Sequence, residues 1–473
     1  MSGEPDMKKQ KLKKFIEFAS GLLPHEVKYL LDIQQFEDSD NLTILNQTNE
    51  YVNKNADNNI FSTHIDKRKF SRIMRWMQEK LRAADVDAEF SLLIELENNL
   101  MNDNLSQGQE KQLLKIINNT EQDEYYFMKR YELGLHFLNF LLVRMRHKEY
   151  HIIEDFINKY KSQYDHCRMV YMRIQKATND IIQQYTYNDI ESRQWESWLL
   201  TIFRDPLMDG MNRYYALVRL VFLYFNYNLQ DKMEALFEEI DPVLASGKFY
   251  SRRILINYYG NRLLYHSKAN RLDLAEKYGW LSISEKNSDY LHYANNLCAV
   301  LLKKGALNDA LKLMQDVFPD VKTTSNFHHK TSFTAQYITA LTQNGQYKEA
   351  AQHAEIFLMA NKNEILRHRW HLFFSVFFRS LFLKGDYKKI IQYSQKLNLI
   401  EKERKYLKRI NSLPAIQWYF EAARYQSEII EINELNNSLR SILNGGEHPD
   451  KQKQIIEELK IEIRKKIPEV KIK

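Results

Sequence analysis

Two histidines four residues apart raise the question of a metal site. His147 and His151 flank Glu149, and imidazole and carboxylate groups together are typical zinc ligands. In the zinc-binding motif of metalloproteases, however, the glutamate directly follows the first histidine. The segment also lies where one helix is expected to turn into the next, so the two rings need not share a face. We therefore interpret it as a surface turn.

Further histidines lie near two successive helices in the C-terminal half of the chain. His328 and His329 are adjacent, and the segment 367–371 contains His368 and His371 together with two arginines and a tryptophan. These four side chains could converge in space, but no carboxylate lies at a spacing typical of metal or catalytic sites. We interpret them as structural or exposed histidines.

Other catalytic and cofactor-binding patterns do not occur in the sequence. It contains neither a GxGxxG loop nor a Walker motif, so a glycine-rich phosphate cradle is not predicted. Cys167 and Cys298 lie in apolar helical runs and are interpreted as small buried residues, without a disulfide framework. We predict a protein that is not an enzyme and that uses no metal and no cofactor.

A turn signature recurs along the C-terminal two-thirds of the chain. Gly305, Gly345 and Gly385 lie 40 residues apart, and each ends an apolar helical run. A small residue follows five positions later in two copies, as Ala310 and Ala350. Weaker copies lie at 230–235 and 270–275, and eroded ones near 148–150 and 185–187. Such a period indicates a helical solenoid, because one helix pair cannot bury its apolar face without a stacked neighbour.

These turns resemble those of the tetratricopeptide family. That family places a glycine between helices A and B, an aromatic residue two positions later and a small residue five positions later. Tyr347 and Tyr387 fill the aromatic position, Leu307 fills it imperfectly, and Ile390 departs from the small residue. The resemblance is strong over about 250–400 and weaker over about 125–250. It implies a right-handed α-solenoid whose A helices line a concave groove.

Amide side chains recur nine residues before successive turns, at positions that the resemblance places in the groove. An amide offers both a donor and an acceptor, so a ladder of amides can pair with an extended peptide backbone. Asparagine is common at this position of the family whether or not a ligand binds, so a structural role stays open. Neighbouring aromatic rings are expected to supply apolar anchors. The predicted peptide-binding residues are Asn257, Asn261, Asn296, Gln336, Tyr258 and Tyr293.

The charge of the chain argues against nucleic acid as the main ligand. Its 68 basic and 61 acidic residues are interleaved and leave a net charge of +7, which is only mildly basic. Arginines lie beside aromatic residues in several A helices, a mixture that can bind single strands but more often combines core rings with solvated arginines. They are Arg213, Arg252, Arg253 and Arg379. The basic helix predicted over 67–82 is interpreted first as an ordinary amphipathic helix.

The composition and the caps predict an all-α chain in three regions. Only 13 glycines and 8 prolines occur in 473 residues, while 44% are hydrophobic, which is typical of a helical protein with a long core. We expect a helical N-terminal region over 1–120, a solenoid over 121–430, and a capping helix and tail over 431–473. Neither a signal peptide nor a membrane span is predicted, so we expect a cytoplasmic protein.

Helix boundaries in the outer regions follow from individual residues. Pro24 predicts a helix through Phe36, Asp66 is expected to cap a helix over 67–84, and Ser106 to precede a helix ending near 118. Asp85 or Asp87 is expected to cap the helix between these two, and 53–65 is the best linker candidate. A turn is predicted at 445–446, followed by a helix whose apolar face should dock on the last repeat. That face contains Ile455, Ile456, Leu459 and Ile463.

Three hypotheses for the function follow. The first is an intracellular interaction scaffold that holds a peptide segment or a partner protein in the groove. The second is a peptide-responsive regulator, because a helical N-terminal region before a tetratricopeptide solenoid is similar to the arrangement of the peptide-pheromone receptors of Gram-positive bacteria. The third is a nucleic-acid-associated factor or an enzyme with an unrecognised site. The sequence does not name the partner or the oligomeric state.

Overall fold

The described part of the chain is helical throughout. The computed structural model describes residues 12–54, 60–62, 64–187, 191–406, 413–443 and 450–471, and every regular element within these ranges is a helix. This confirms the predicted all-α class, while the handedness of the helix array stays a prediction. The chain divides into two compact units, Met1–Ala269 and Asn270–Lys473, and each is described by itself. The boundaries expected near 120 and 430 are not tested by this division.

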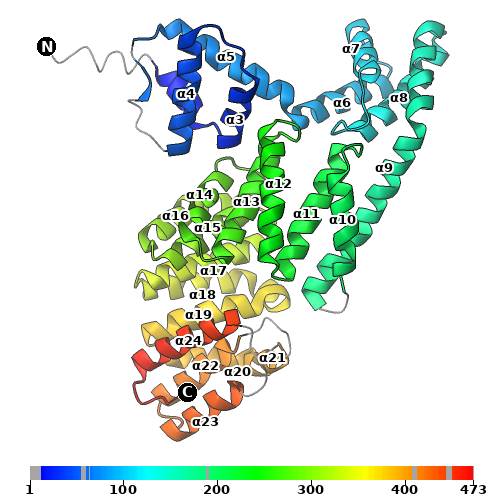
Figure 1. Cartoon of the computed structure of the whole chain (residues 1–473). Coiled ribbons are helices and arrows are strands. Elements are labelled where there is room, and N and C mark those ends of the chain that lie inside the picture. The colour runs from blue at the N-terminus through cyan, green and yellow to red at the C-terminus, as the bar shows by residue number, and fades with distance from the viewer. Residues whose placement is uncertain are drawn as a thin grey trace, which may run out of the picture. The chain divides into compact units, whose positions relative to one another are not determined.

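The first unit is built from helices that pack against their neighbours in the chain (Figure 1). Helix α3 packs against α4, α8 against α9, and α10 against α11. A short 3₁₀ turn, η2, covers Arg193–Trp195. The α-helices are α2 Lys13–Ser20, α3 Pro24–Ile33, α4 Ser39–Lys54, α5 Lys67–Ala84, α6 Val86–Met101, α7 Gln107–Asn118, α8 Phe127–Val143, α9 His147–Tyr187, α10 Glu196–Arg204, α11 Gly210–Asn226, α12 Gln230–Ala245 and α13 Arg252–Lys268.

Three predicted N-caps of the first unit are confirmed. The side chains of Asp66, Asp85 and Ser106 accept hydrogen bonds from backbone N–H groups in the first turns of α5, α6 and α7, which satisfies donors that have no partner within the helix. Helix α3 ends at Ile33 rather than at Phe36. The backbone of Gln34 is extended and its side chain accepts from the Phe36 N–H at 2.8 Å, so a local turn replaces the last helical turn.

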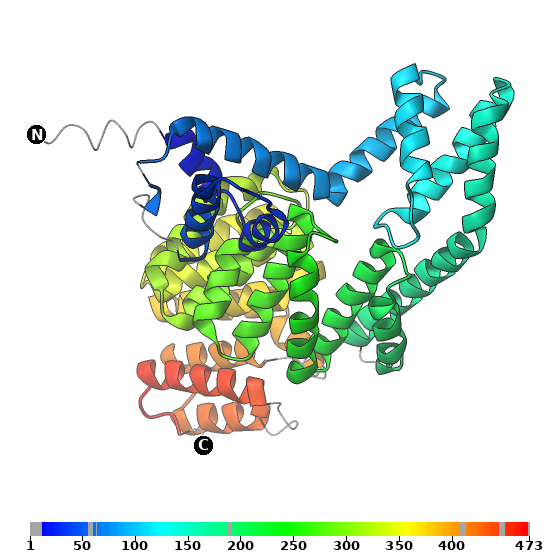
Figure 2. The ribbon, with the colours of Figure 1, turned by 45° about the horizontal axis from the view of Figure 1, so that its top comes forward.

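Helix α9 is the longest element, with 41 residues, and both views show it beside α8 (Figures 1 and 2). The turn before it contains Met145, whose φ is 56°. His147 is therefore the first residue of the helix, and His147 and His151 share a helical face, which corrects the expectation that this pair lies in the turn. The His151 Nδ1 atom is 3.2 Å from Glu154 Oε2, an ordinary surface contact.

Two buried polar contacts hold α3 against α12 and α13. His25 is nearly buried, and its Nδ1 atom is 2.8 Å from the Tyr259 hydroxyl while its Nε2 atom is 3.1 Å from Asp241 Oδ1. The Tyr258 hydroxyl donates to the same carboxylate oxygen at 2.7 Å. We call His25, Asp241, Tyr258 and Tyr259 the buried histidine clamp. It joins residues more than 200 positions apart in the sequence.

The carboxylate of Glu26 is the second contact between these elements. It is fully buried and accepts hydrogen bonds from the Tyr250 hydroxyl at 2.6 Å and from Arg252 Nε at 2.9 Å. The backbone N–H of Leu23 donates to its other oxygen at 2.8 Å. A buried charge is stable when its lone pairs are used in this way, so the N-terminal helices are an integral part of the first unit.

The second unit continues the pairing of successive helices. Helix α15 packs against α14, α16 and α17, and α19 against α17 and α18. A π-helical segment, η3, covers Ile365–Arg369. The α-helices are α14 Leu272–Ser282, α15 Tyr290–Lys304, α16 Leu307–Thr323, α17 Phe327–Gln343, α18 Tyr347–Glu364, α19 Trp370–Lys384, α20 Tyr387–Lys396, α21 Leu399–Tyr406, α22 Ala415–Gln426, α23 Ile432–Leu443 and α24 Asp450–Lys466.

The three glycine turns of the repeat are confirmed. Gly305, Gly345 and Gly385 have φ values of 85°, 76° and 87°, the left-handed conformation that glycine adopts without strain at a helix end. Each separates two helices that pack against each other. The predicted crossing residues Ala310 and Ala350 have no exposed surface. Ile390, at the same position of the third turn, is equally buried.

Helix α24 packs through the face that the sequence predicted. Ile456 and Ile463 are buried and Leu459 is half-buried, whereas the side chain of Ile455 and the turn at 445–446 lie outside the described residues. Glu462 accepts from Arg379 Nε on α19 and from the Tyr419 hydroxyl on α22, both at 2.7 Å. These contacts fix α24 on its neighbours, and its role as a cap of the array stays a prediction.

Candidate ligand-binding surface

Two of the predicted amides lie in the first unit and bond to each other. On α13, Asn261 Nδ2 donates to Asn257 Oδ1 at 3.1 Å, and the Tyr214 hydroxyl donates to the same oxygen at 3.4 Å. Both amides are half-buried. Tyr258 is only 6% exposed, because its ring lies in the interior and its hydroxyl belongs to the buried histidine clamp.

The other two amides lie in the second unit, on neighbouring helices. Asn296 is on α15 and Gln336 on α17, and both are partly exposed. Tyr293 is 6% exposed, so its ring packs in the interior as that of Tyr258 does. Since the four amides belong to two separate units, a single groove through all of them stays a prediction.

Four histidines of the second unit gather beside these amides. The rings of His292 and His329 are stacked, with centroids 6.3 Å apart, and those of His328 and His368 are 5.5 Å apart. We call these four residues the histidine cluster; it joins α15, α17 and η3. His328 and His368 therefore do converge, although the sequence analysis interpreted them as separate structural or exposed residues. His371 lies elsewhere, because its Nε2 atom is 2.8 Å from the buried carboxylate of Glu403.

His292 was not singled out by the sequence analysis. It lies four residues before Asn296 and so on the same face of α15, and the amide Nδ2 of Asn296 is 3.3 Å from His292 Nε2. The spacing to an already predicted amide is the signal that would have found it. The histidine cluster and Asn296 therefore belong to one surface, and Gln336, seven residues after His329, lies on the same side of α17.

The π-helical segment η3 brings His368 and Arg369 to this surface. Helices α18, η3 and α19 follow one another without a loop. Asn361 and Arg369 have φ values near −132° rather than helical ones. A π segment widens the helix and is frequent at functional sites. Here it connects two helices that the repeat pattern would separate by a loop.

The hydrogen bonds define which ring nitrogens of the cluster are free to donate. Arg369 Nε donates to His328 Nδ1 at 3.1 Å, so a neutral His328 ring carries its proton on Nε2. The Asn296 amide donates to His292 Nε2, which places the His292 proton on Nδ1 in the same way. His368 Nε2 is 3.7 Å from Glu364 Oε2. The cluster thus presents N–H groups of several elements together with one permanent cation.

Desolvation, and then neighbouring positive charge, lowers the pKa of two histidines of the cluster. The pKa of His292 is lowered, chiefly because burial against neighbouring helices desolvates the ring, and further by His329 and Arg369, while Asp289 acts in the opposite direction. The pKa of His328 is lowered by desolvation and then by Arg369, His368 and His329. Both rings are therefore neutral at pH 7. Among the described residues, no group of three or more His, Cys, Asp and Glu is placed to hold a metal ion.

Arginines that suggested phosphate binding in the sequence have partners within the chain. Arg213 Nε donates to the Phe203 carbonyl at 3.0 Å, Arg252 binds Glu26, and Arg253 binds Asp87 at 2.7 Å. Arg379 binds Glu462. On the basic helix α5, Lys69 binds Asp38 and Asp40. These side chains contribute to packing between helices, which leaves less of their charge available to a polyanion.

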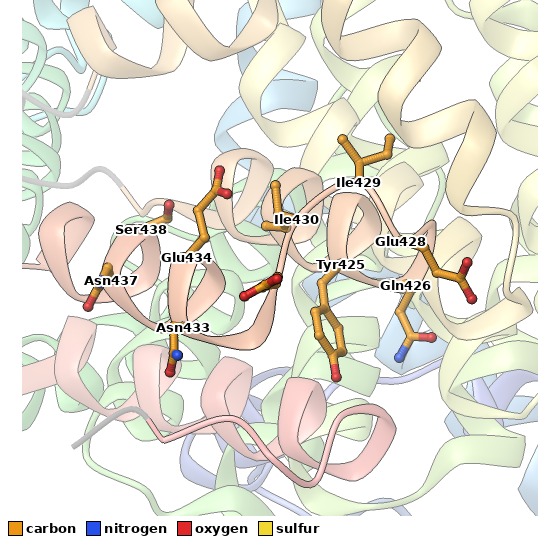
Figure 3. A pocket seen from close by; sticks show the side chains of 10 residues that line it. Tyr425, Gln426, Glu428, Ile429, Ile430, Asn433, Glu434, Asn437 and Ser438 are labelled. Carbon is orange, nitrogen blue, oxygen red and sulfur yellow. The ribbon is translucent and has the colours of Figure 1, made fainter.

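An open hollow of 1080 Å³ lies elsewhere in the second unit, around the turn between α22 and α23. Its lining includes Tyr425, Glu428, Ile429 and Glu434 (Figure 3). The side chains point apart rather than toward a common centre: Ile429 projects away from Tyr425, and Glu428 to a third side. This hollow therefore lacks the converging polar groups of a catalytic or small-molecule site.

Comparisons with known proteins add no support to the tetratricopeptide resemblance, which therefore depends on the turn residues alone. No family model, no curated protein and no solved structure matches the chain. Within the described ranges, no helix is long and apolar enough to cross a membrane.

Proposed function

We propose that the protein is an intracellular interaction scaffold that binds an extended peptide segment of a partner protein on the surface of α15 and α17. The observation that carries the proposal is the set of polar side chains along these two neighbouring helices. His292 and Asn296 on α15, and His329 and Gln336 on α17, all reach solvent.

The opposite faces of the same helices give this surface a rigid base. Ala294, Leu297 and Cys298 on α15, and Phe333 and Ile338 on α17, have no exposed surface. Side chains on packed helices lose little further freedom when a ligand binds. Amides held in this way supply donors and acceptors to a peptide backbone, which favours binding rather than chemistry as the role of the surface.

The proposal is tested with peptides selected by display against the wild-type protein. We expect Asn296→Ala and Gln336→Ala each to weaken the selected peptides about tenfold to a hundredfold, because an unpaired desolvated amide partner costs about 1–3 kcal/mol. Asn308→Ala is the matched control, since Asn308 is an exposed amide on α16. Affinities by fluorescence anisotropy that stay within twofold of wild type in both amide variants would refute the proposal.

A further inference from the structure

We infer that the histidine cluster, together with Arg369 and Asn296, is a binding site for a phosphoryl group on the peptide, and that the cluster takes up protons when the group binds. The inference rests on the proposed function, because it assigns the chemistry of a segment held on α15 and α17. It follows from the meeting of imidazole, guanidinium and amide groups from three elements on one exposed surface.

The number of donors, and their origin in three elements, favours a phosphoryl group over other groups of a peptide. Arg369 has guanidinium N–H groups beyond the Nε that binds His328. His328 and His292 each retain one ring N–H, and the Asn296 amide has a second hydrogen. These donors belong to α15, α17 and η3, so a ligand that contacts all of them needs acceptors on more than one side. A phosphoryl group offers three strong acceptor oxygens, whereas a carboxylate offers two in one plane.

The charges around the cluster make binding depend on protons. The groups that face its rings are Arg369 and the other histidines on the positive side, and Asp289 near His292 and Glu364 near His368 on the negative side. Without a ligand, desolvation and mutual repulsion keep His292 and His328 neutral at pH 7. A doubly negative ligand reverses the sign of the local field and favours the protonated rings. The added proton occupies His328 Nδ1 or His292 Nε2, so the hydrogen bond from Arg369 or Asn296 to that nitrogen is released and this donor becomes available to the ligand.

The direction of the pH dependence follows from this. Since the rings are neutral when free and protonated when a ligand is bound, affinity increases as the pH falls from the alkaline side towards neutrality and below. The second ionisation of a phosphate monoester lies near pH 6, so below that value the ligand itself loses charge and affinity declines. We expect an optimum near pH 6 and a gain of about threefold to tenfold between pH 7.5 and 6.2.

A metal ion is a poorer match for the same residues. Arg369 lies within hydrogen-bond distance of His328, and a guanidinium beside a ligating nitrogen repels a cation. Two of the ring nitrogens already accept hydrogen bonds. The positive neighbour and the remaining N–H donors instead match an anion.

The test uses a degenerate peptide library with a central phosphoserine and its unphosphorylated counterpart, titrated against the full chain. At pH 6.5 we expect the phosphorylated library to bind about tenfold or more tightly, the equivalent of one strong charge-assisted contact. Arg369→Gln and His328→Gln should each remove most of this preference, measured in each variant as the ratio of its affinities for the two libraries. Arg404→Gln, which changes an exposed arginine outside the cluster, should leave the preference intact, and melting curves check that each variant is folded.

The possible outcomes separate this inference from the proposed function. If both libraries bind equally and Asn296→Ala weakens both, the scaffold proposal stands and the phosphoryl site is refuted. If neither library binds, both proposals fail. A single-stranded RNA that binds as tightly as the phosphorylated library, with the same loss in Arg369→Gln, would assign the cluster to nucleic acid and refute a phosphopeptide site. Histidine resonances that keep their titration midpoints in the presence of the phosphorylated library would refute the proton uptake.

Discussion

Histidine occurs in two contrasting settings in this molecule. In the first unit, His25 is buried, and both ring nitrogens contact groups that satisfy them, the Tyr259 hydroxyl and the carboxylate of Asp241. In the second unit, the pKa of His292 is lowered, first because packing desolvates part of the ring and then by His329 and Arg369, while the rest of the side chain reaches solvent. His25 therefore connects segments that are distant in the sequence, whereas His292 belongs to a surface on which a bound anion would make favourable interactions.

The difference shows that the neighbours of an imidazole decide its role more than the imidazole itself. A ring with complementary partners stabilises the fold, and little is gained by exposing it to a ligand. A ring beside positively charged or protonatable groups contributes little to the stability of the fold. An anionic ligand can supply the favourable interactions that such a ring lacks within the chain. The two sites should therefore respond in opposite ways to the same substitutions.

The largest effect is expected for His25→Ala. Its removal leaves the fully buried Tyr259 hydroxyl without a ring nitrogen and opens a cavity between α3 and α13, which should lower the free energy of unfolding by about 2–4 kcal/mol. The matched variant His292→Ala should change it by less than about 0.5 kcal/mol. Urea unfolding of both variants measures the contrast. An equal decrease in the free energy of unfolding for both variants would contradict the distinction between the structural role of His25 and the surface role of His292.

A somewhat smaller effect is expected at the crossing of α17 and α18. Ala350 has no exposed surface, so Ala350→Leu inserts methyl and methylene groups into packed space and should destabilise the second unit by about 1–3 kcal/mol. The control is Ala360→Leu at an exposed position of the same helix. Thermal melts of the two variants would show whether the crossing of α17 and α18 is tightly packed. A melt of Ala350→Leu that matches wild type would contradict the assigned crossing of the helices.

The contribution of the buried histidine clamp should be visible in how steeply the stability of the protein falls with pH in the acid range. The hydrogen bond with His25 and that from Tyr258 hold the pKa of Asp241 well below its usual range. A carboxyl group with a lowered pKa contributes stability above about pH 4, and this stability is lost as the pH falls through the lowered value. Asp241→Asn should therefore flatten the acid limb of the stability profile, measured as urea midpoints from pH 5 to pH 2. Asp231→Asn on the same helix should follow the wild-type slope, and identical slopes in all three proteins would contradict the prediction.

The smallest effect on folding is expected for Asn296→Ala. This amide is partly exposed and its partner His292 reaches solvent, so the free energy of unfolding should change by less than about 0.5 kcal/mol. The same variant should lose most of its peptide affinity, as described above. A large loss of stability measured by urea unfolding would instead assign Asn296 to the structural group that contains His25.

Local features of the fold were predictable from the sequence because they depend on neighbouring residues. A glycine that ends a helix, as Gly305 does, or an aspartate that caps one, as Asp66 does, acts within a single turn. The buried histidine clamp was not predictable in this way. It joins His25 to Asp241 across 216 positions, and nothing in the pattern of either segment points to the other.

The candidate surface was predictable in part. The resemblance to the tetratricopeptide turns placed Asn296 and Gln336 nine residues before Gly305 and Gly345, and both side chains are partly exposed. The register gave no account of η3, since a π segment shifts the phase of the residues that follow it. It also placed Tyr258 and Tyr293 beside the ligand, although both rings fill space between helices. Aromatic residues have no single preferred depth, so their type alone does not separate an anchor from a core residue.

The loop-free passage from α18 through η3 to α19 has an evolutionary consequence. Loops ordinarily absorb insertions and deletions between repeats, but 347–384 offers no loop in which to place them. Loss of one residue from η3 would keep the chain helical and turn α19 about its axis by about 100° relative to α18. Phe373, Phe374 and Phe377, which are fully buried, would then face new neighbours. Sequences that evolve from this one can therefore change side chains in the segment, but insertions and deletions within it are disfavoured.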